Sequence, residues 1–591
     1  MTPNMQNPLS RNGRQITLFV AVLFAFGVIA TRLTFLHVVD REEYLVHLDE
    51  YRTRIDELPA RRGDILDRRG NIQATSQPYY VIGVDPHAIN ESDWGQFIEI
   101  ASILNIEPSE VLRAFENTHI TQEKKRRWVK LAERVDEESY RALEKIVSRG
   151  IYGVRTFERF YPGHFSAAHV LGMMNKEDQP VTGIERVFDF YLRGQDGWRE
   201  TESDSRRQEL AQFRTREILP KNGLDVVLTL DQVIQHFAES AATEINSNYK
   251  PDGISIIVSE VDTGSILAMS VFPNFDPNTY WKFPISHHRN RALTDVFEPG
   301  STFKIVAASG ALEEGLVKIN DTFDTSLSAI EYNGRRVRLP RDHKAYDQMT
   351  MSEVVVKSSN RGVAFLGMLL GDQGMYEYSR SFGFGERTRI NLSAEVSGVL
   401  HTPKNWDGLT ISRLPMGHAV SATPVQVHMA TSVIANDGIR MAPRIVESIV
   451  DEHKVPVVRV PPKEVGRVVS ENTARVMTRL LTEVVSPTGT ARHAQIPSFK
   501  AAGKTGTTQK IVNGLYSNQE HVSSFSGFFP AQRPEIVITI VVDNPKLEGV
   551  GYGGRVAGPV FAKLGKQIAE YLGFEAESYR TVYAMKGEAA Q

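Results

Sequence analysis

The stretch Phe297-Glu298-Pro299-Gly300-Ser301-Thr302-Phe303-Lys304 carries the strongest signal in this chain of 591 residues. Its proline and glycine break regular structure, and a helical pattern opens at Ser301 and runs to about Glu314. The positive end of the helix dipole then lies at the Ser301 hydroxyl, and the free Ser301 N–H can stabilise an oxyanion. Lys304 follows one turn later on the same face, within reach of that hydroxyl. Ser301 is therefore the candidate nucleophile and Lys304 its candidate base.

A lysine amine acts as a base only when it is neutral. Lys304 therefore needs a pKa that is lowered by burial and by a neighbouring cation. Lys504, in a third motif described below, can supply that cation.

A second motif, Ser358-Ser359-Asn360, follows the segment Met351–Lys357, which is predicted to be helical. Ser358 can relay a proton between Lys304 and a leaving amine. The side-chain amide of Asn360 can hold both Lys304 and a substrate backbone.

The third motif, Lys504-Thr505-Gly506-Thr507, lies on a predicted edge strand, which offers free N–H and C=O groups to an extended peptide. Lys504 and the hydroxyls of Thr505 and Thr507 can bind a carboxylate, and Gly506 leaves room for a close approach of the substrate. The Thr507 N–H is the expected second oxyanion donor, beside that of Ser301.

Each motif alone is common: a capping serine with a surface lysine, a turn, or a polar edge strand. The combination of all three, in this order and each in a fitting local setting, is uncommon. They indicate an enzyme that forms an acyl bond on Ser301.

Composition is that of a folded protein, with 41% apolar and 24% charged residues. The net charge of −3 gives no indication of a nucleic-acid partner. The chain has no cysteine, which excludes disulfides, cysteine-ligated zinc and thiol catalysis.

The segment Ile16–Val39 is apolar and long enough to cross roughly 30 Å of hydrocarbon as a helix. Arg11 and Arg14 precede it, so residues 1–15 are expected in the cytoplasm and everything after about residue 40 outside. A cleaved signal peptide is the alternative, but Arg32 and Phe35 stand where its cleavage site would be. No second apolar run of this length follows, so a single crossing is expected, and Arg32 within it points to a partner helix.

The extracytoplasmic body divides into a mixed segment, 40–222, and an α/β segment, 223–573, followed by a polar tail, 574–591. In the first segment we predict a strand at Tyr79–Val84 and helices at Trp94–Leu104 and Ser109–Asn117. Its arginine and acidic residues are interpreted as structural ion pairs.

The second segment predicts an α+β domain: one antiparallel sheet, built from both ends of the segment, with a helical middle inserted. The predicted strands are Asp225–Leu230, Ile254–Glu260, Ser265–Ser270, Phe499–Thr507, Val522–Phe529 and Ile536–Val542, and the flanking helices are Asp231–Asn246 and Pro559–Leu572.

The three motifs resemble those of the penicillin-binding protein and serine β-lactamase superfamily, and nearly the whole chain looks like a class B penicillin-binding protein. Asn290–Asp295 with Phe297–Gly300 is similar to the division-type branch, the FtsI family. The first segment resembles a class B pedestal through Arg62-Gly63-Asp64-Ile65 with Asp67-Arg68, Arg159-Phe160-Tyr161-Pro162 and Gly183-Ile184-Glu185. Met416-Gly417-His418-Ala419 departs from the family, which more often has a glycine-rich aromatic stretch there.

The resemblance implies a peptidoglycan D,D-transpeptidase without metal or organic cofactor. Ser301 would attack the penultimate D-Ala of a D-Ala-D-Ala stem peptide, an amine of a neighbouring strand would resolve the acyl-enzyme, and β-lactams would mimic the donor. It further implies a single-pass protein of the plasma (inner) membrane that acts at the division septum. Its partners there would be a polytopic membrane glycosyltransferase of the FtsW type and other divisome proteins.

Four alternatives stay open at this point. An elongation-type class B enzyme would share the chemistry, and a D,D-carboxypeptidase would differ only in using water as acceptor. A membrane-tethered β-lactamase shares two motifs, but it lacks a pedestal and tends to have an apolar residue in place of Asn360. A scaffold that activates a glycosyltransferase would not need the intact motifs.

Overall fold

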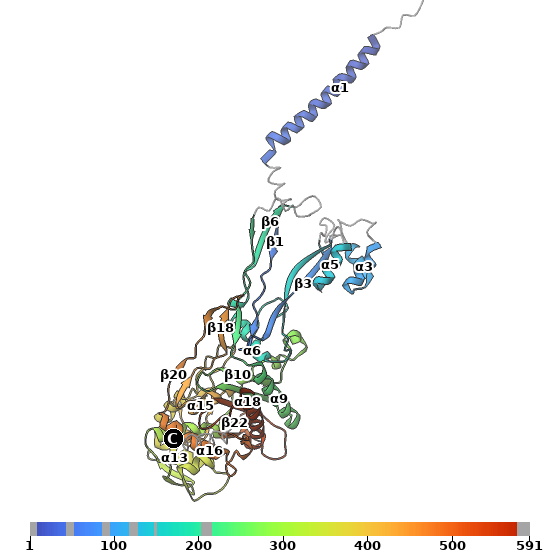
Figure 1. Cartoon of the computed structure of the whole chain (residues 1–591). Coiled ribbons are helices and arrows are strands. Elements are labelled where there is room, and N and C mark those ends of the chain that lie inside the picture. The colour runs from blue at the N-terminus through green and yellow to red at the C-terminus, as the bar shows by residue number, and fades with distance from the viewer. Residues whose placement is uncertain are drawn as a thin grey trace, which may run out of the picture. The chain divides into compact units, whose positions relative to one another are not determined.

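The computed structural model describes residues 9–42, 53–84, 95–116, 128–146, 151–202 and 216–575 (Figure 1). They form two compact units. The first takes in the described residues of Met1–Ala60, Pro78–Thr156 and Gln195–Asn222, and the second those of Arg61–Gln77, Phe157–Gly194 and Gly223–Gln591. The second unit thus contains two pieces of the segment 40–222. The mixed α/β fold expected from the sequence is confirmed.

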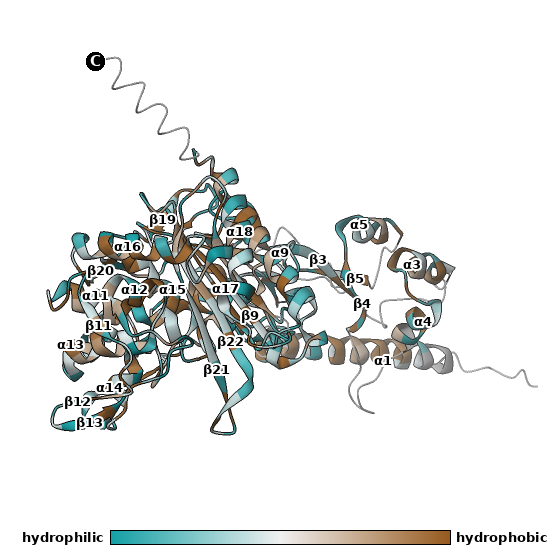
Figure 2. Cartoon of the chain, turned by 90° about the horizontal axis from the view of Figure 1, so that it is seen from below, coloured by the Kyte–Doolittle hydropathy of each residue, from teal (hydrophilic) through white to brown (hydrophobic). Residues whose placement is uncertain are grey.

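The N-terminal helix α1 (Leu9–Thr34) continues as the π-helical turn η1 (Phe35–Val39). Among the described residues, Gln15–Val39 is the one helical stretch that is long and apolar enough to cross a membrane, with a mean hydropathy of 2.2. The hydroxyls of Thr17, Thr31 and Thr34 each donate to the carbonyl four residues earlier, so these polar groups are satisfied within the helix. The helix is largely brown in Figure 2. It fits the single-pass anchor predicted at Ile16–Val39, whereas residues 1–8 of the expected tail lie outside the described residues.

The first unit contains a three-stranded antiparallel sheet, ordered β1 (Thr53–Leu58), β6 (Gly197–Glu202) and β7 (Arg216–Ile218). It also contains an apolar cluster around Ile82, Phe97 and Val111. That cluster joins the end of β3 (Ile72–Val84) and β4 (Val129–Val135) to helices α3 (Phe97–Leu104), α4 (Pro108–Glu116) and α5 (Glu137–Ile146).

The strand and the two helices predicted in this segment are therefore present. The strand begins seven residues earlier than predicted, at Ile72 rather than Tyr79. Trp94 and Asn117, at the outer ends of the predicted helices, lie outside the described residues.

The pedestal signatures meet in the second unit around one buried carboxylate. Glu185 is fully buried, and it accepts from Arg62 Nε at 2.7 Å and from Arg159 Nε at 2.6 Å. Tyr161 donates to it at 3.3 Å, and Arg62 also contacts Asp189 at 2.5 Å. A buried charge is tolerated only when it is paired, so these contacts hold three distant segments together.

The core of the second unit is a five-stranded antiparallel sheet ordered β10-β9-β23-β22-β21. Its strands are β9 (Gly253–Glu260), β10 (Ile266–Phe272), β21 (Ala502–Val512), β22 (Leu515–Phe529) and β23 (Ile536–Asp543). Two strands come from the start of the segment and three from its end, as predicted, and β21 is an edge strand.

The predicted strand Asp225–Leu230 lies elsewhere. It forms β8 (Asp225–Leu228), which pairs with β18 (Val446–Val450) and, in parallel, with β2 (Ile65–Leu66). The prediction that all strands of the segment form a single sheet is therefore wrong for this strand. Its apolar pattern shows that it is buried but not which distant strand it pairs with.

Helices cover both faces of the five-stranded sheet. On one face, Phe561 of α18 (Gly558–Leu572) packs against Phe525 of β22, beside α9 (Gln232–Tyr249) (Figure 1). On the other, His428 of α15 (Pro424–Ala435) bonds to Ser259 at 2.7 Å and to Thr539 at 2.9 Å. Burial lowers the pKa of His428 to about 3, so this imidazole is neutral.

Four further helices of the inserted middle lie around the three motifs. They are α11 (Lys304–Glu313), α12 (Met351–Val356), α13 (Asn360–Ser381) and α16 (Glu471–Val485). Residues Lys304–Ala311 of α11 are buried all round, which places the start of this helix deep in the second unit, next to the edge strand.

Candidate active site

The three motifs come together in one hydrogen-bonded group. Ser301 lies in the 3₁₀ turn η6 (Gly300–Phe303), which runs directly into α11. The Ser358 hydroxyl lies 3.1 Å from the Ser301 hydroxyl, 2.8 Å from Lys504 Nζ and 3.2 Å from Lys304 Nζ. Ser358 is thus the centre of the group and connects both lysines to the candidate nucleophile.

Lys304 reaches the second motif rather than Ser301 itself. Its amine donates to the Ser358 carbonyl at 2.6 Å and to Asn360 Oδ1 at 2.7 Å. All hydrogen bonds of this amine within the described residues go to Ser358 and Asn360. The direct contact expected from the three-residue spacing is replaced by a path through Ser358, because the Ser358 carbonyl and the Asn360 amide oxygen both accept from this amine.

Both lysines are buried, with 2% of each residue exposed. Burial, together with the charge of Lys504, holds the pKa of Lys304 well below its usual range, and Asp342 opposes this shift. Burial alone lowers the pKa of Lys504 to about 7. Desolvation thus shifts the pKa of Lys304 in the direction that the sequence required, toward the neutral amine.

The second motif is held by an aspartate that the sequence did not single out. Asp342 accepts from the Ser359 hydroxyl at 2.7 Å, from the Asn360 N–H and from the Arg361 N–H at 3.2 Å. Ser358, just before, has a φ of +58°, a conformation that non-glycine residues rarely adopt. Asp342 therefore fixes a strained turn from a loop that carries no recognisable motif.

The third motif lies on the edge strand β21 as predicted. Thr505 and Thr507 line the cleft, and the Thr507 hydroxyl accepts from the Gly553 N–H at 3.0 Å. A Cβ at Gly506 would lie 2.3 Å from Ser524 Oγ and 3.0 Å from the Pro299 carbonyl. The glycine is thus required by the packing of the strand against its neighbours, in addition to any close approach of a substrate.

The cleft has a volume of about 560 Å³. Besides the motif residues Ser301, Ser358, Ser359, Thr505 and Thr507, it is lined by Asp342, His343, Lys344, Tyr346, Val356, Lys357, Thr488, Gly489, Thr490, Tyr552, Gly553 and Gly554. The two expected oxyanion donors thus belong to residues that face the same space.

Sequence reasoning missed the wall formed by residues 552–554. The glycine-rich run Gly549–Gly554 is the sequence feature that could have indicated this wall. A Cβ at Gly553 would lie 2.4 Å from the Gly506 carbonyl, so this wall can pack directly against the third motif only because it has no side chain there.

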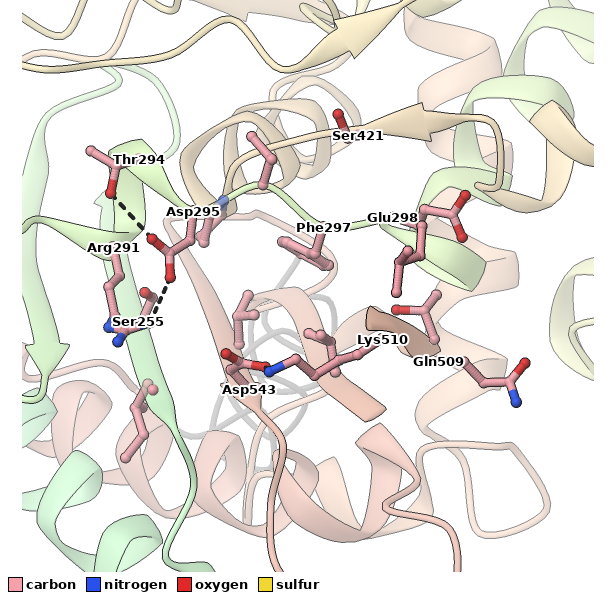
Figure 3. A pocket seen from close by; sticks show the side chains of 18 of the residues that line it. Ser255, Arg291, Thr294, Asp295, Phe297, Glu298, Ser421, Gln509, Lys510 and Asp543 are labelled. Carbon is pink, nitrogen blue, oxygen red and sulfur yellow. Dashed lines mark hydrogen bonds and ion pairs between the residues drawn. The ribbon is translucent and has the colours of Figure 1, made fainter. Parts of the chain in front are cut away.

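A second cavity, of about 490 Å³, lies behind the segment that leads to Ser301 (Figure 3). Phe297 and Glu298 line it on one side. In its wall, Asp295 accepts from Arg291 at 2.7 Å, and Lys510 pairs with Asp543 at 2.9 Å. The segment before the nucleophile therefore has hollow space on one side.

A serine at the start of a helix, beside two buried lysines, is the arrangement found in enzymes that transfer acyl groups through a serine. Comparison with known proteins identifies the family. The model of the penicillin-binding protein transpeptidase domain matches residues 254–566, and that of the penicillin-binding protein dimerisation domain matches residues 57–228. The chain belongs to the penicillin-binding protein family, and this pair of domains places it in class B.

Curated relatives match over most of the chain. Stage V sporulation protein D of Bacillus subtilis (strain 168) is 31% identical over 480 residues, covering 80% of this chain and 73% of the relative. The peptidoglycan D,D-transpeptidase FtsI of Escherichia coli (strain K12) is 28% identical over 513 residues, covering 86% of this chain and 83% of the relative.

Solved structures agree. A peptidoglycan synthetase from Bifidobacterium adolescentis is 26% identical, with a TM-score of 0.72 over 89% of this chain and 98% of that one. Penicillin-binding protein 3 from Mycobacterium tuberculosis, complexed with aztreonam, is 27% identical. Its TM-score is 0.68, and the match covers 88% of this chain and 98% of that one.

Proposed function

We propose that this chain is a peptidoglycan D,D-transpeptidase that cross-links stem peptides through an acyl-enzyme on Ser301. One observation carries the proposal: the Ser358 hydroxyl connects Ser301 to two lysines that are both buried. The family, and relatives named peptidoglycan D,D-transpeptidase, support the same reaction.

In the acylation step, neutral Lys304 takes the Ser301 proton through the Ser358 hydroxyl. Ser301 Oγ then attacks the carbonyl of the penultimate D-Ala, and the backbone N–H groups of Ser301 and Thr507 stabilise the oxyanion. The proton returns through Ser358 to the nitrogen of the terminal D-Ala, the C–N bond breaks, and D-alanine leaves. Asn360 keeps Lys304 in place through its side-chain oxygen.

The donor peptide binds as an added strand along β21. Lys504 and the hydroxyls of Thr505 and Thr507 hold the carboxylate of the terminal D-Ala. The Thr507 hydroxyl already accepts a hydrogen bond from the Gly553 N–H, so its proton stays available to the carboxylate.

An amine of a neighbouring stem peptide then attacks the acyl-enzyme and releases Ser301. A β-lactam would acylate Ser301 in the same way but leave a slowly hydrolysed adduct. Water in place of the amine would make the protein a carboxypeptidase, so the acceptor is the point that an experiment must decide.

The full chain in detergent should be incubated with a stem pentapeptide ending in D-Ala-D-Ala and with an amine acceptor peptide. We expect D-alanine release together with a cross-linked product in the mass spectrum, and only slow turnover of nitrocefin. Release without a cross-link would indicate a carboxypeptidase, sustained nitrocefin hydrolysis a β-lactamase, and no reaction a scaffold.

We further propose that the chain crosses the inner membrane once, with its N-terminus in the cytoplasm and its catalytic domain outside, and that it works at the division septum. The apolar helix Gln15–Val39 and the preceding Arg11 and Arg14 support this topology. Relatives named FtsI support the septal role. Arg32 in the span suggests a membrane partner, which we take to be a polytopic glycosyltransferase of the FtsW type within the divisome.

Replacing residues 16–39 by an unrelated anchor should weaken the complex with this glycosyltransferase, yet leave penicillin labelling of the solubilised protein intact. The matched control is Ser301→Ala with its own anchor, which should still localise and still bind. Depletion of the protein should produce filamentous cells. Round cells that continue to divide would instead assign the protein to elongation.

A further inference from the structure

The nucleophile is positioned by three chain segments that meet at Gly300. The Gly300 N–H donates to the Gly417 carbonyl at 3.1 Å. A Cβ at Gly417 would lie 2.1 Å from the Gly300 carbonyl, and a Cβ at Gly300 would lie 2.4 Å from Thr508 Cγ2. The turn that carries Ser301 is thus enclosed between the 416–419 loop and the substrate strand β21, and a shift of either would move the hydroxyl.

One carboxylate joins all three segments. Glu298, three residues before Ser301, contacts His418 Nδ1 at 2.5 Å and accepts from the Ala419 N–H at 3.1 Å. The Tyr516 hydroxyl, from the hairpin of β21 and β22, lies 3.1 Å from both of its oxygens. Only 11% of the Glu298 side chain is exposed, and its contact with His418 is partly buried, whereas the Ala419 N–H and the Tyr516 hydroxyl reach it from the exposed side.

These polar contacts matter because apolar packing is incomplete here. Phe297 and Glu298 line the second cavity, and Val296 is 49% exposed. In Figure 3 the Glu298 carboxylate points away from Asp295 and Lys510, toward the end of the cavity opposite Asp295. The segment is therefore held by Phe297 against the core, by the backbone bridge of Phe297 to Ala422 and by the contacts of Glu298, while the cavity leaves one side of it without packing.

Tyr516 suits the role of a fixed donor. Burial and the charge of Glu298 raise the pKa of Tyr516 to about 12, so its hydroxyl keeps its proton at neutral pH. Its ring also meets the His418 ring edge to face, with 6.0 Å between the ring centroids. Tyr516 and His418 thus support each other as well as the carboxylate.

We propose that Glu298 is a positioning residue for acylation. Its carboxylate holds the Ser301 turn, the 416–419 loop and the β21–β22 hairpin in one arrangement, so that the hydroxyl meets a substrate bound on β21 at reacting distance. The inference rests on the proposed function, because it concerns the rate at which Ser301 is acylated. It also assigns a task to His418, in the segment that departs from the family pattern.

The test measures acylation of the full chain in detergent by a fluorescent penicillin, separating the limiting rate constant from the half-saturating concentration. Glu298→Ala should lower the rate constant by about 10- to 100-fold, the effect of misplacing a reacting group by up to an ångström. The half-saturating concentration should stay nearly constant, since β21 itself is untouched. Glu298→Gln, which keeps an acceptor for the Ala419 N–H and for Tyr516, should recover part of the rate.

Tyr516→Phe should also slow acylation, and the double variant with Glu298→Ala should be no slower than Glu298→Ala alone, because both changes remove the same contact. Tyr378→Phe is the matched control. Its hydroxyl donates to Glu314 at 2.6 Å, at the far end of α11, and its rate should equal that of the wild type.

Unchanged rate constants for Glu298→Ala, or effects of Glu298→Ala and Tyr516→Phe that multiply, would overturn the inference. So would a change confined to the half-saturating concentration. A wild-type chain that is not acylated at all would overturn the proposed function itself, which is a different result.

Discussion

Replacing Ser301 by alanine is expected to abolish covalent labelling by penicillin while the protein stays folded. We propose this hydroxyl as the nucleophile, so its removal should leave the penicillin without the group that it acylates. The substitution removes one oxygen, and Ser358 keeps its contacts with Lys304 and Lys504. Fluorescence in a denaturing gel and the mass of the intact adduct measure the effect.

Ser309→Ala is the matched control for this experiment. Ser309 lies on α11, the helix that follows the Ser301 turn. It is fully buried, and its hydroxyl has no hydrogen-bond partner within the described residues. Labelling of this variant should equal that of the wild type. A β-lactam adduct on any residue other than Ser301 would refute the assignment.

Arginine at position 304 is expected to cut the acylation rate by at least about 10²-fold, the low end for the loss of a general base. In the proposed mechanism the neutral form of Lys304 takes the proton, whereas an arginine stays protonated in proteins. Lys504→Arg keeps the positive charge that binds the carboxylate and should cost less. Equal losses in the two variants would contradict the roles proposed for the two lysines.

The wild type and Lys504→Arg should also differ in their response to pH. Because the pKa of Lys504 is lowered to about 7, this side chain is charged below that pH and neutral above it. The affinity for a donor carboxylate should therefore fall in the wild type as the pH rises from about 6 to about 8, through the lowered pKa of Lys504. In Lys504→Arg the fall should be absent, which a titration of the half-saturating donor concentration would show.

Much of this protein could be predicted from local patterns. Sequence patterns that span about ten residues each predicted four features. These are the apolar helix, the five strands of the central sheet, the edge position of β21 and the helix that opens at Ser301. The residues proposed for chemistry also belong to short motifs, and their order along the chain indicated their joint role before any distance was known.

The predictions failed where a contact joins distant segments. The periodicity of Asp225–Leu228 predicted a strand, but its partner is β18, more than two hundred residues away in the sequence. The spacing of Ser301 and Lys304 predicted a direct contact between their side chains. In the structure Ser358 lies between them, because the Ser358 carbonyl and Asn360 Oδ1 both accept from the Lys304 amine.

The residue types available for acyl transfer, the membrane-length helix and the sheet built from both ends of the second segment could all be predicted from the sequence. Three features became visible only in the folded chain: Asp342 holds the second motif, Glu298 joins the Ser301 turn to His418 and Tyr516, and two lysines are desolvated together. Propensity and periodicity are local properties of the chain. Burial, pKa and hydrogen-bond partners depend on which distant segments exclude water from the same place.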